Sequence, residues 1–84
     1  MALYFVSYDL RKDRDYNDLY DLLRTLNAKK VLESTYCFNA DKTAKELRDQ
    51  FREHIDADDG ICVTKVTSWA SYGTHSTPKD LQSD

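Results

Sequence analysis

The chain has 84 residues and a mass of 9.8 kDa, which is enough for one folded domain and too little for two. Hydrophobic residues make up 40% and charged residues 32%, with 2 Gly and 1 Pro, and this composition excludes a linker or a disordered tail. No apolar run approaches the roughly 20 residues that span a bilayer, and the opening residues lack the basic leader and cleavage motif of a signal peptide. We therefore expect a cytoplasmic protein with no membrane partner.

The charge of the chain is acidic overall and unevenly distributed. A net charge of −3 argues against a protein that coats nucleic acid non-specifically, because that mode of binding requires many Lys and Arg. Residues 1–30 nevertheless carry a net charge of +1 and residues 31–84 a net charge of −4. The basic groups cluster at 11–14 and 29–30, which indicates either a solvated loop and a helix end or a surface for phosphate.

The first half of the chain predicts a strand followed by a helix. Residues 2–9 are rich in aromatic and β-branched types and end at a charged turn, as strands do. Residues 16–26 predict an amphipathic helix with Asp15 as its N-cap, and Asn27 can end it in the left-handed conformation. The apolar positions of this helix have the spacing i, i+3, i+4 and i+7: Leu19, Leu22, Leu23 and Leu26.

The second half predicts further strands and a second helix. Residues 30–39 form either one bent strand or two short strands that meet near Glu33 and Ser34. Thr43 and Glu46 have the spacing of a capping box, which predicts a helix over 44–55. The acidic turn, residues 56–60, ends this helix, and residues 61–67 form the last main strand. The buried face of the helix over 44–55 is expected to consist of Ala44, Leu47, Phe51 and Ile55.

This order of elements predicts an α+β fold, a ferredoxin-like βαββαβ antiparallel sheet with two helices on one face. The domain occupies residues 1–68, and residues 69–84 form a polar C-terminal tail whose last residues, 76–84, are loosely held. Both faces of the strands contain many apolar residues, and an exposed apolar face usually marks a partner surface. We therefore expect a homodimer that forms through the second face of the sheet, with the tail partly ordered across the dimer.

Asp9 is the main candidate for chemistry, because Gly-rich phosphate loops and the familiar hydrolase motifs are absent from the sequence. It ends the first strand, just before Arg11, Lys12 and Arg14. A carboxylate there could bind Mg²⁺ or Mn²⁺ while the arginines hold a phosphodiester. One carboxylate is a poor divalent site, but two copies of Asp9 could face each other across a dimer axis. The alternative is that Asp9 caps the turn with its side chain.

Other polar and aromatic residues have simpler interpretations. Cys37 and Cys62 lie in separate apolar segments with no metal-binding spacing, and we expect both to be buried core thiols. His54 is expected to have a partly buried structural role, and His75 lies in the polar tail. Most tyrosines are expected in the core or an interface. Trp69 and Tyr72, after the last strand, either contact a protein partner or fold back over the sheet edge.

Two segments resemble a known family. The run Tyr4 to Arg11 (YFVSYDLR) is an apolar strand that ends in Tyr-Asp-aliphatic, and Val31 to Tyr36 (VLESTY) contains a Ser-x-aromatic signature. Both are similar to the small CRISPR-associated nuclease and scaffold subunit that accompanies the spacer integrase. The helix and acidic turn over 43–59 agree with that family, and the similarity covers about residues 2–67. The virulence-associated protein D ribonucleases share this fold and opening.

The resemblance implies a ferredoxin-like homodimer in which Asp9 binds Mg²⁺ or Mn²⁺ near the dimer axis. It also implies that Arg11, Arg14, Ser34 and Tyr36 lie near that site. The first hypothesis is a CRISPR-associated or virulence-associated homodimeric endonuclease that cuts RNA or DNA, with RNA favoured. The alternatives are a non-catalytic dimeric scaffold of the same fold and a small regulatory module that binds a ligand.

Overall fold

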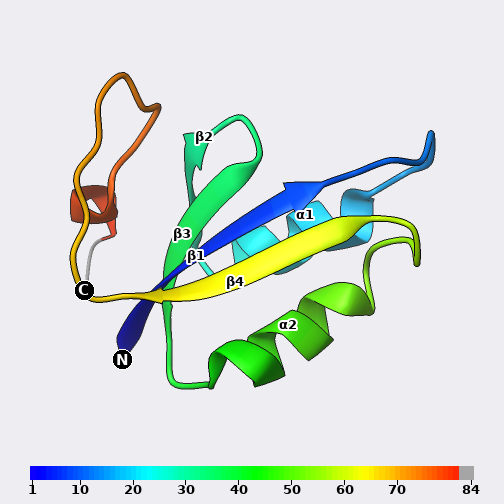
Figure 1. The fold of residues 1–84 in the computed structure, drawn as a ribbon, viewed down its shortest axis with the longest axis horizontal. Coiled ribbons are helices and arrows are strands. Elements are labelled where there is room, and N and C mark those ends of the chain that lie inside the picture. Colours follow the sequence, from blue (N-terminus) through cyan, green and yellow to red (C-terminus); the bar gives the residue numbers. More distant parts are fainter. Residues whose placement is uncertain (82–84) are drawn as a thin grey trace.

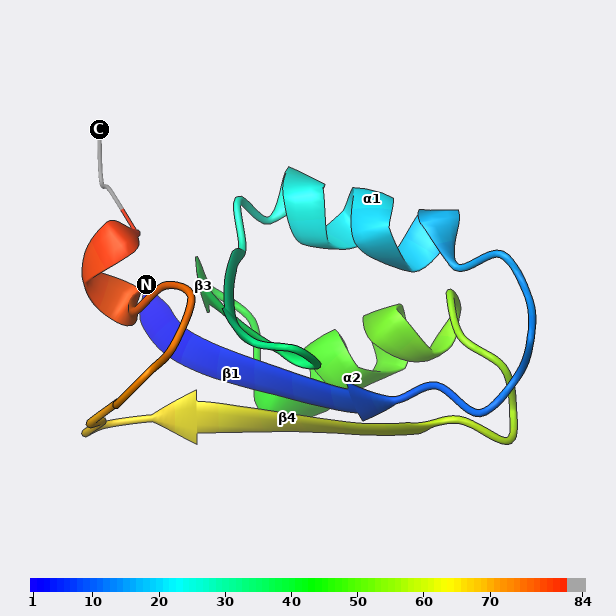
Figure 2. The same ribbon diagram turned by 90° about the horizontal axis from the view of Figure 1, so that it is seen from above.

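The computed structural model describes residues 1–81, which form a four-stranded antiparallel sheet and two α-helices (Figure 1). The strand order is β2-β3-β1-β4, so β1 is central and β2 and β4 form the edges. Figure 2 shows both helices on the same side of the sheet. The predicted ferredoxin-like α+β fold is confirmed. Its elements are β1 (Ala2–Asp9), α1 (Asn17–Thr25), β2 (Lys29–Leu32), β3 (Thr35–Ala40), α2 (Ala44–Arg52), β4 (Gly60–Val66) and the 3₁₀ turn η1 (Pro78–Asp80).

Local sequence signals set the helix ends. Thr43 accepts a hydrogen bond from the backbone N–H of Glu46, whose carboxylate accepts one from the N–H of Thr43, so the predicted capping box is confirmed. Asn27 has a φ of 57°, the left-handed conformation expected after α1. Asp15 is not the N-cap of α1, because Tyr16 occupies that position. The Asp15 carboxylate instead accepts the N–H of Asn17 at 2.8 Å.

The structure decides one boundary that the sequence left open and corrects another that the sequence placed too late. Residues 30–39 form two strands joined at Glu33 and Ser34, with an irregular register between Lys30 and Leu32. The helix expected over 44–55 ends at Arg52. It ends early because the N–H groups of Glu53 and His54 bond to carbonyls three residues back, which tightens the last turn.

The core lies between the sheet and the helices. Tyr4 and Val6 of β1 and Phe38 of β3 project to this side, where they pack against apolar side chains of both helices. Burial of these side chains is the dominant stabilising contribution to the fold. The buried helix residues in this cluster are Leu19, Leu22, Leu23, Leu47 and Phe51.

The helix-free face of the sheet is more polar than we expected from the apolar residues in the strands. Ser7 and Thr64 project to this face and are exposed. Cys62 lies beside Ser7 on the same face and is also exposed, so the prediction that it is a core thiol is wrong. Cys37 is fully buried, as expected.

The C-terminal segment covers part of this second face. Val31 is 3% exposed although it lies outside the main core, and its carbonyl accepts the N–H of His75 at 2.9 Å. Phe5, Val31 and Trp69 line a hollow of about 240 Å³ between the sheet and this segment. Within the tail that we expected to be loosely held, residues 77–80 form a capped 3₁₀ turn, and residues 82–84 lie outside the described residues. Trp69 therefore folds back over the sheet, whereas Tyr72 is 99% exposed.

Candidate functional site

Asp9 lies at the end of the central strand, on the helix-free face. Its backbone is paired with Gly60, the first residue of β4. The Asp9 side chain is 71% exposed, and its Oδ2 accepts a hydrogen bond from Nε of Arg11 at 3.1 Å. A Cβ at position 60 would lie 3.1 Å from Nη2 of Arg11, so Gly60 gives this guanidinium its room. The terminal strand position, the glycine opposite and the arginine together form a small polar site open to solvent.

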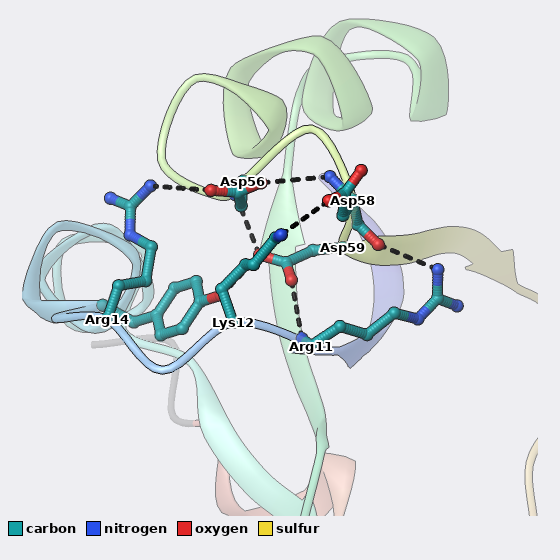
Figure 3. Close-up of polar contacts among 7 residues, drawn as sticks. Arg11, Lys12, Arg14, Asp56, Asp58 and Asp59 are labelled. Atoms are coloured by element: carbon teal, nitrogen blue, oxygen red, sulfur yellow. Dashed lines mark hydrogen bonds and ion pairs between the residues drawn. The ribbon is translucent and has the colours of Figure 1, made fainter.

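The basic loop, residues 10–16 between β1 and α1, lies against the acidic turn that precedes β4. Figure 3 shows Arg11, Lys12 and Arg14 on one side and the aspartates of the turn on the other. The backbone N–H of Arg11 donates to Oδ1 of Asp59 at 2.7 Å. Its Nη1 donates to the carbonyl of Asp58 at 2.9 Å. Arg11 therefore links the Asp9 carboxylate to the acidic turn.

The other two cations of the basic loop form ion pairs across the same interface. Nζ of Lys12 lies 2.8 Å from Oδ2 of Asp58, and Nη1 of Arg14 lies 3.9 Å from Oδ2 of Asp56. The Arg14 guanidinium also lies 5.1 Å from the centre of the Tyr16 ring, within cation–π range. The cations proposed for phosphate binding thus already have anionic partners within the same chain.

Asp59 joins the two loops. In addition to Arg11, it accepts the hydroxyl of Tyr16 at 2.7 Å and the backbone N–H of Asp56 at 2.8 Å. Desolvation of the carboxylate acts to raise its pKa, but the hydrogen bonds from Arg11, Tyr16 and Asp56 outweigh this effect, so the pKa of Asp59 lies below its ordinary value of 3.8. Burial and the bond to Asp59 raise the pKa of Tyr16.

Ser34 and Tyr36 are placed differently from Asp9. Ser34 lies in the turn between β2 and β3, and its carbonyl accepts the N–H of Tyr8 at 3.1 Å. Tyr36 projects to the helix side of the sheet, where its ring stacks on Tyr8 with centroids 6.2 Å apart. Burial, and then the nearby Tyr36 and Tyr20, raise the pKa of Tyr8. The structure thus brings Arg11 to Asp9 but places the Tyr36 side chain on the opposite face.

The two candidate histidines are not part of this site. His54 follows α2 and is half-buried, whereas His75 is exposed and linked through its backbone to Val31. Over residues 1–81, no group of three or more His, Cys, Asp or Glu side chains is arranged to hold a metal ion. The alternative role of Asp9 was to cap the turn after β1. Within residues 1–81 its carboxylate accepts no hydrogen bond from a backbone N–H of that turn and bonds to the Arg11 side chain instead.

The sequence analysis missed the pairing of the acidic turn with the basic loop. The signal was nevertheless present. In a ferredoxin-like sheet β1 and β4 are antiparallel neighbours, so the end of β1 meets the start of β4. Three aspartates just before β4 must therefore lie beside the cations that follow β1.

The fold and the site define the class of this protein: a small ferredoxin-like α+β domain with an exposed carboxylate at the end of β1 and a cationic loop after it. None of the helices in the described part of the chain has the length and apolar character needed to cross a membrane. The sequence model of the family described as CRISPR associated protein Cas2 matches residues 1–72. The chain belongs to this family, which is the first of the two that its sequence resembles.

A solved structure is similar over most of its length. It is the crystal structure of a hypothetical protein from Thermus thermophilus, with 25% sequence identity and a TM-score of 0.65. The match covers 84% of this chain and 88% of that chain. The two proteins therefore share the fold over nearly the whole domain.

The lowered pKa of Asp59 predicts a pH-dependent contribution to stability. A carboxylate whose pKa is lower in the folded protein stabilises it fully above its unfolded-state pKa, and this contribution is lost as the pH falls through the folded-state value. Asp59→Asn should therefore lower the melting temperature above about pH 5. The difference from wild type should shrink below pH 3.8, where the wild-type carboxylate becomes protonated. Thermal unfolding followed by circular dichroism across this range measures it.

Asp13→Asn is the matched control, because Asp13 is an exposed aspartate of the basic loop, which the acidic turn contacts. Its melting temperature should stay close to that of wild type across the range. A constant difference between Asp59→Asn and wild type at every pH would contradict the assigned role of the carboxylate charge.

Proposed function

We propose that this CRISPR-associated chain acts as a homodimer on nucleic acid and that Asp9 is the central residue of a metal-dependent endonuclease site, with RNA the favoured substrate. The observation that carries the proposal is the position of Asp9. Its carboxylate is exposed at the end of the central strand, with the guanidinium of Arg11 at hydrogen-bond distance and the cations of the basic loop next in sequence. This arrangement offers one group for a cation and several for a phosphodiester.

A divalent ion does not fit the residues of one protomer alone. Asp9 supplies a single carboxylate, and that carboxylate is already bonded to Arg11. Mg²⁺ prefers near-octahedral oxygen ligands and is usually held by one or two carboxylates together with waters and substrate phosphate. The proposed site for Mg²⁺ or Mn²⁺ therefore depends on a second Asp9 from the partner copy. Such an ion would polarise the phosphodiester and activate water.

The residues of this chain have separate proposed roles. Arg11 and Arg14 are planar, always charged and suited to bidentate binding of phosphate oxygens, and Lys12 adds a third cation. Arg11 also bonds to Asp9, so it can place the phosphate beside the carboxylate. The hydrogen bond that the backbone N–H of Tyr8 donates to the Ser34 carbonyl fixes the strand just before Asp9. Tyr36 acts indirectly in this proposal, because its ring supports Tyr8 on the other face.

A second candidate function is a non-catalytic dimeric scaffold of the same fold. The ion pairs of the basic loop favour the scaffold function, because the charges of Asp9, Arg11 and Lys12 are already compensated by partners within the chain. Tyr72 adds a fully exposed aromatic side chain on the C-terminal segment, a type of residue that is enriched in protein interfaces. In this function, Trp69 and Tyr72 would contact a protein partner, and Asp9 would have no catalytic role.

Cleavage tests the two functions directly. Labelled single-stranded RNA and duplex DNA are incubated with Mg²⁺, Mn²⁺ or EDTA and with wild-type protein, Asp9→Asn or Asp13→Asn. We expect metal-dependent cutting that Asp9→Asn reduces by at least on the order of 100-fold, since it removes a ligand charge. Asp13→Asn makes the same charge change four residues further along the chain, in the basic loop, and should cleave like wild type. Equal traces of cleavage in wild type and Asp9→Asn would contradict the nuclease proposal and favour the scaffold.

The oligomeric state is a separate prediction. Light scattering after size exclusion should give twice the chain mass of 9.8 kDa at micromolar concentration. Thr64→Glu introduces a charge on the exposed helix-free face and should shift the protein to monomer by charge repulsion between the two copies. Thr67→Glu, just beyond the same strand, is the control and should remain dimeric. A wild-type monomer at this concentration would contradict dimerisation.

A further inference from the structure

We propose that the acidic turn is a built-in competitor for nucleic acid at the basic loop, so that the chain regulates its own affinity for phosphodiesters. This inference rests on the proposed function, because it assumes that the loop binds phosphate. It is drawn from the contacts between the two loops, which the nuclease proposal does not require.

The oxygens of the acidic turn occupy the positions that phosphate oxygens would need. Lys12 pairs with the carboxylate of Asp58, Arg14 lies against that of Asp56, and Arg11 donates to the Asp58 carbonyl. Each contact places an oxygen of the acidic turn beside a cation that could otherwise bind a phosphodiester. A strand of RNA or DNA must therefore displace these partners and also approach their negative charges.

The contacts divide into an anchor and a removable part. The anchor is Asp59, which is held by three hydrogen bonds, one of them from the buried Tyr16. The removable part consists of ion pairs in water: Lys12 is 47% and Asp58 66% exposed, and the Arg14–Asp56 distance is 3.9 Å. Exposed pairs of this kind are weak and screened by salt. The loop can thus keep its position through Asp59 while its cations exchange partners.

The distribution of charge supports a regulatory role. The N-terminal segment that contains the basic loop has a net charge of +1, and the rest of the chain has a net charge of −4. Without the acidic turn, the loop would be a local cationic patch at the open end of the central strand. With it, the patch is neutralised in the free protein, which limits non-specific binding to nucleic acid.

The test is the affinity of the full chain for a fluorescently labelled single-stranded RNA, measured by anisotropy over a series of salt concentrations. The variant is Asp56→Asn with Asp58→Asn. Asparagine keeps the side-chain oxygen that accepts the N–H of Asp58, so the turn is expected to persist. We expect binding on the order of tenfold tighter at low salt. The slope of log K against log salt should become steeper by about 1.4, because two more cations then neutralise phosphates.

Two control variants separate release of the basic loop from a general change of charge. Asp21→Asn with Asp49→Asn removes the same net charge from two exposed aspartates that pair with Arg24 and Arg48 on the helices. It should bind RNA within about twofold of wild type if the effect is local. Adding Lys12→Ala to the Asp56→Asn, Asp58→Asn variant should remove part of the gain, because Lys12 is one of the two released cations.

The RNA affinities of the variants distinguish failure of this inference from failure of the proposed function. An equal gain in the helix control, or no gain in the acidic-turn variant while wild type binds, would overturn the proposal and leave the nucleic-acid function standing. Binding by none of the proteins would overturn both. Circular dichroism and thermal unfolding of each variant verify the fold, and Asp58→Asn alone, which leaves Asp56 in place, provides a milder variant with a smaller expected gain.

Discussion

The geometry of the site depends on one carboxylate. Asp59 accepts hydrogen bonds from the backbone of Arg11, the hydroxyl of Tyr16 and the backbone of Asp56, and thereby fixes the loop after β1 to the turn before β4. Because β1 and β4 are antiparallel neighbours, these two loops must meet at the same end of the sheet. The sheet brings the loops together, and Asp59 determines how they are joined.

The same junction connects the site that we propose for phosphate to the carboxylates that neutralise its cations. Arg11 bonds to the Asp9 carboxylate at one side and to the acidic turn at the other, so the candidate site and its neutralising partners form one connected network. Cations that are paired within the chain do not attract nucleic acid over long distances.

The sequence predicted most of the fold because its signals are local. The capping box at Thr43, the left-handed Asn27 and the alternation of β1 each depend on residues close in the chain. It also predicted that Arg11 lies near Asp9, which is two residues away. The face on which Tyr36 lies, the exposure of Cys62 and the fold-back of the segment after Trp69 depend on register and tertiary packing. These long-range features leave no short pattern in the sequence.

The most direct test of the account is the NMR signal of the Arg11 backbone amide in ¹⁵N-labelled protein as the pH is lowered from neutral. If Asp59 holds the two loops together, this amide exchanges slowly with solvent, and its chemical shift changes with a midpoint below 3.8 as the carboxylate is protonated. Asp59→Asn should abolish that titration. An Arg11 amide that exchanges as fast as an exposed loop residue and does not titrate in this range would contradict the central role of Asp59.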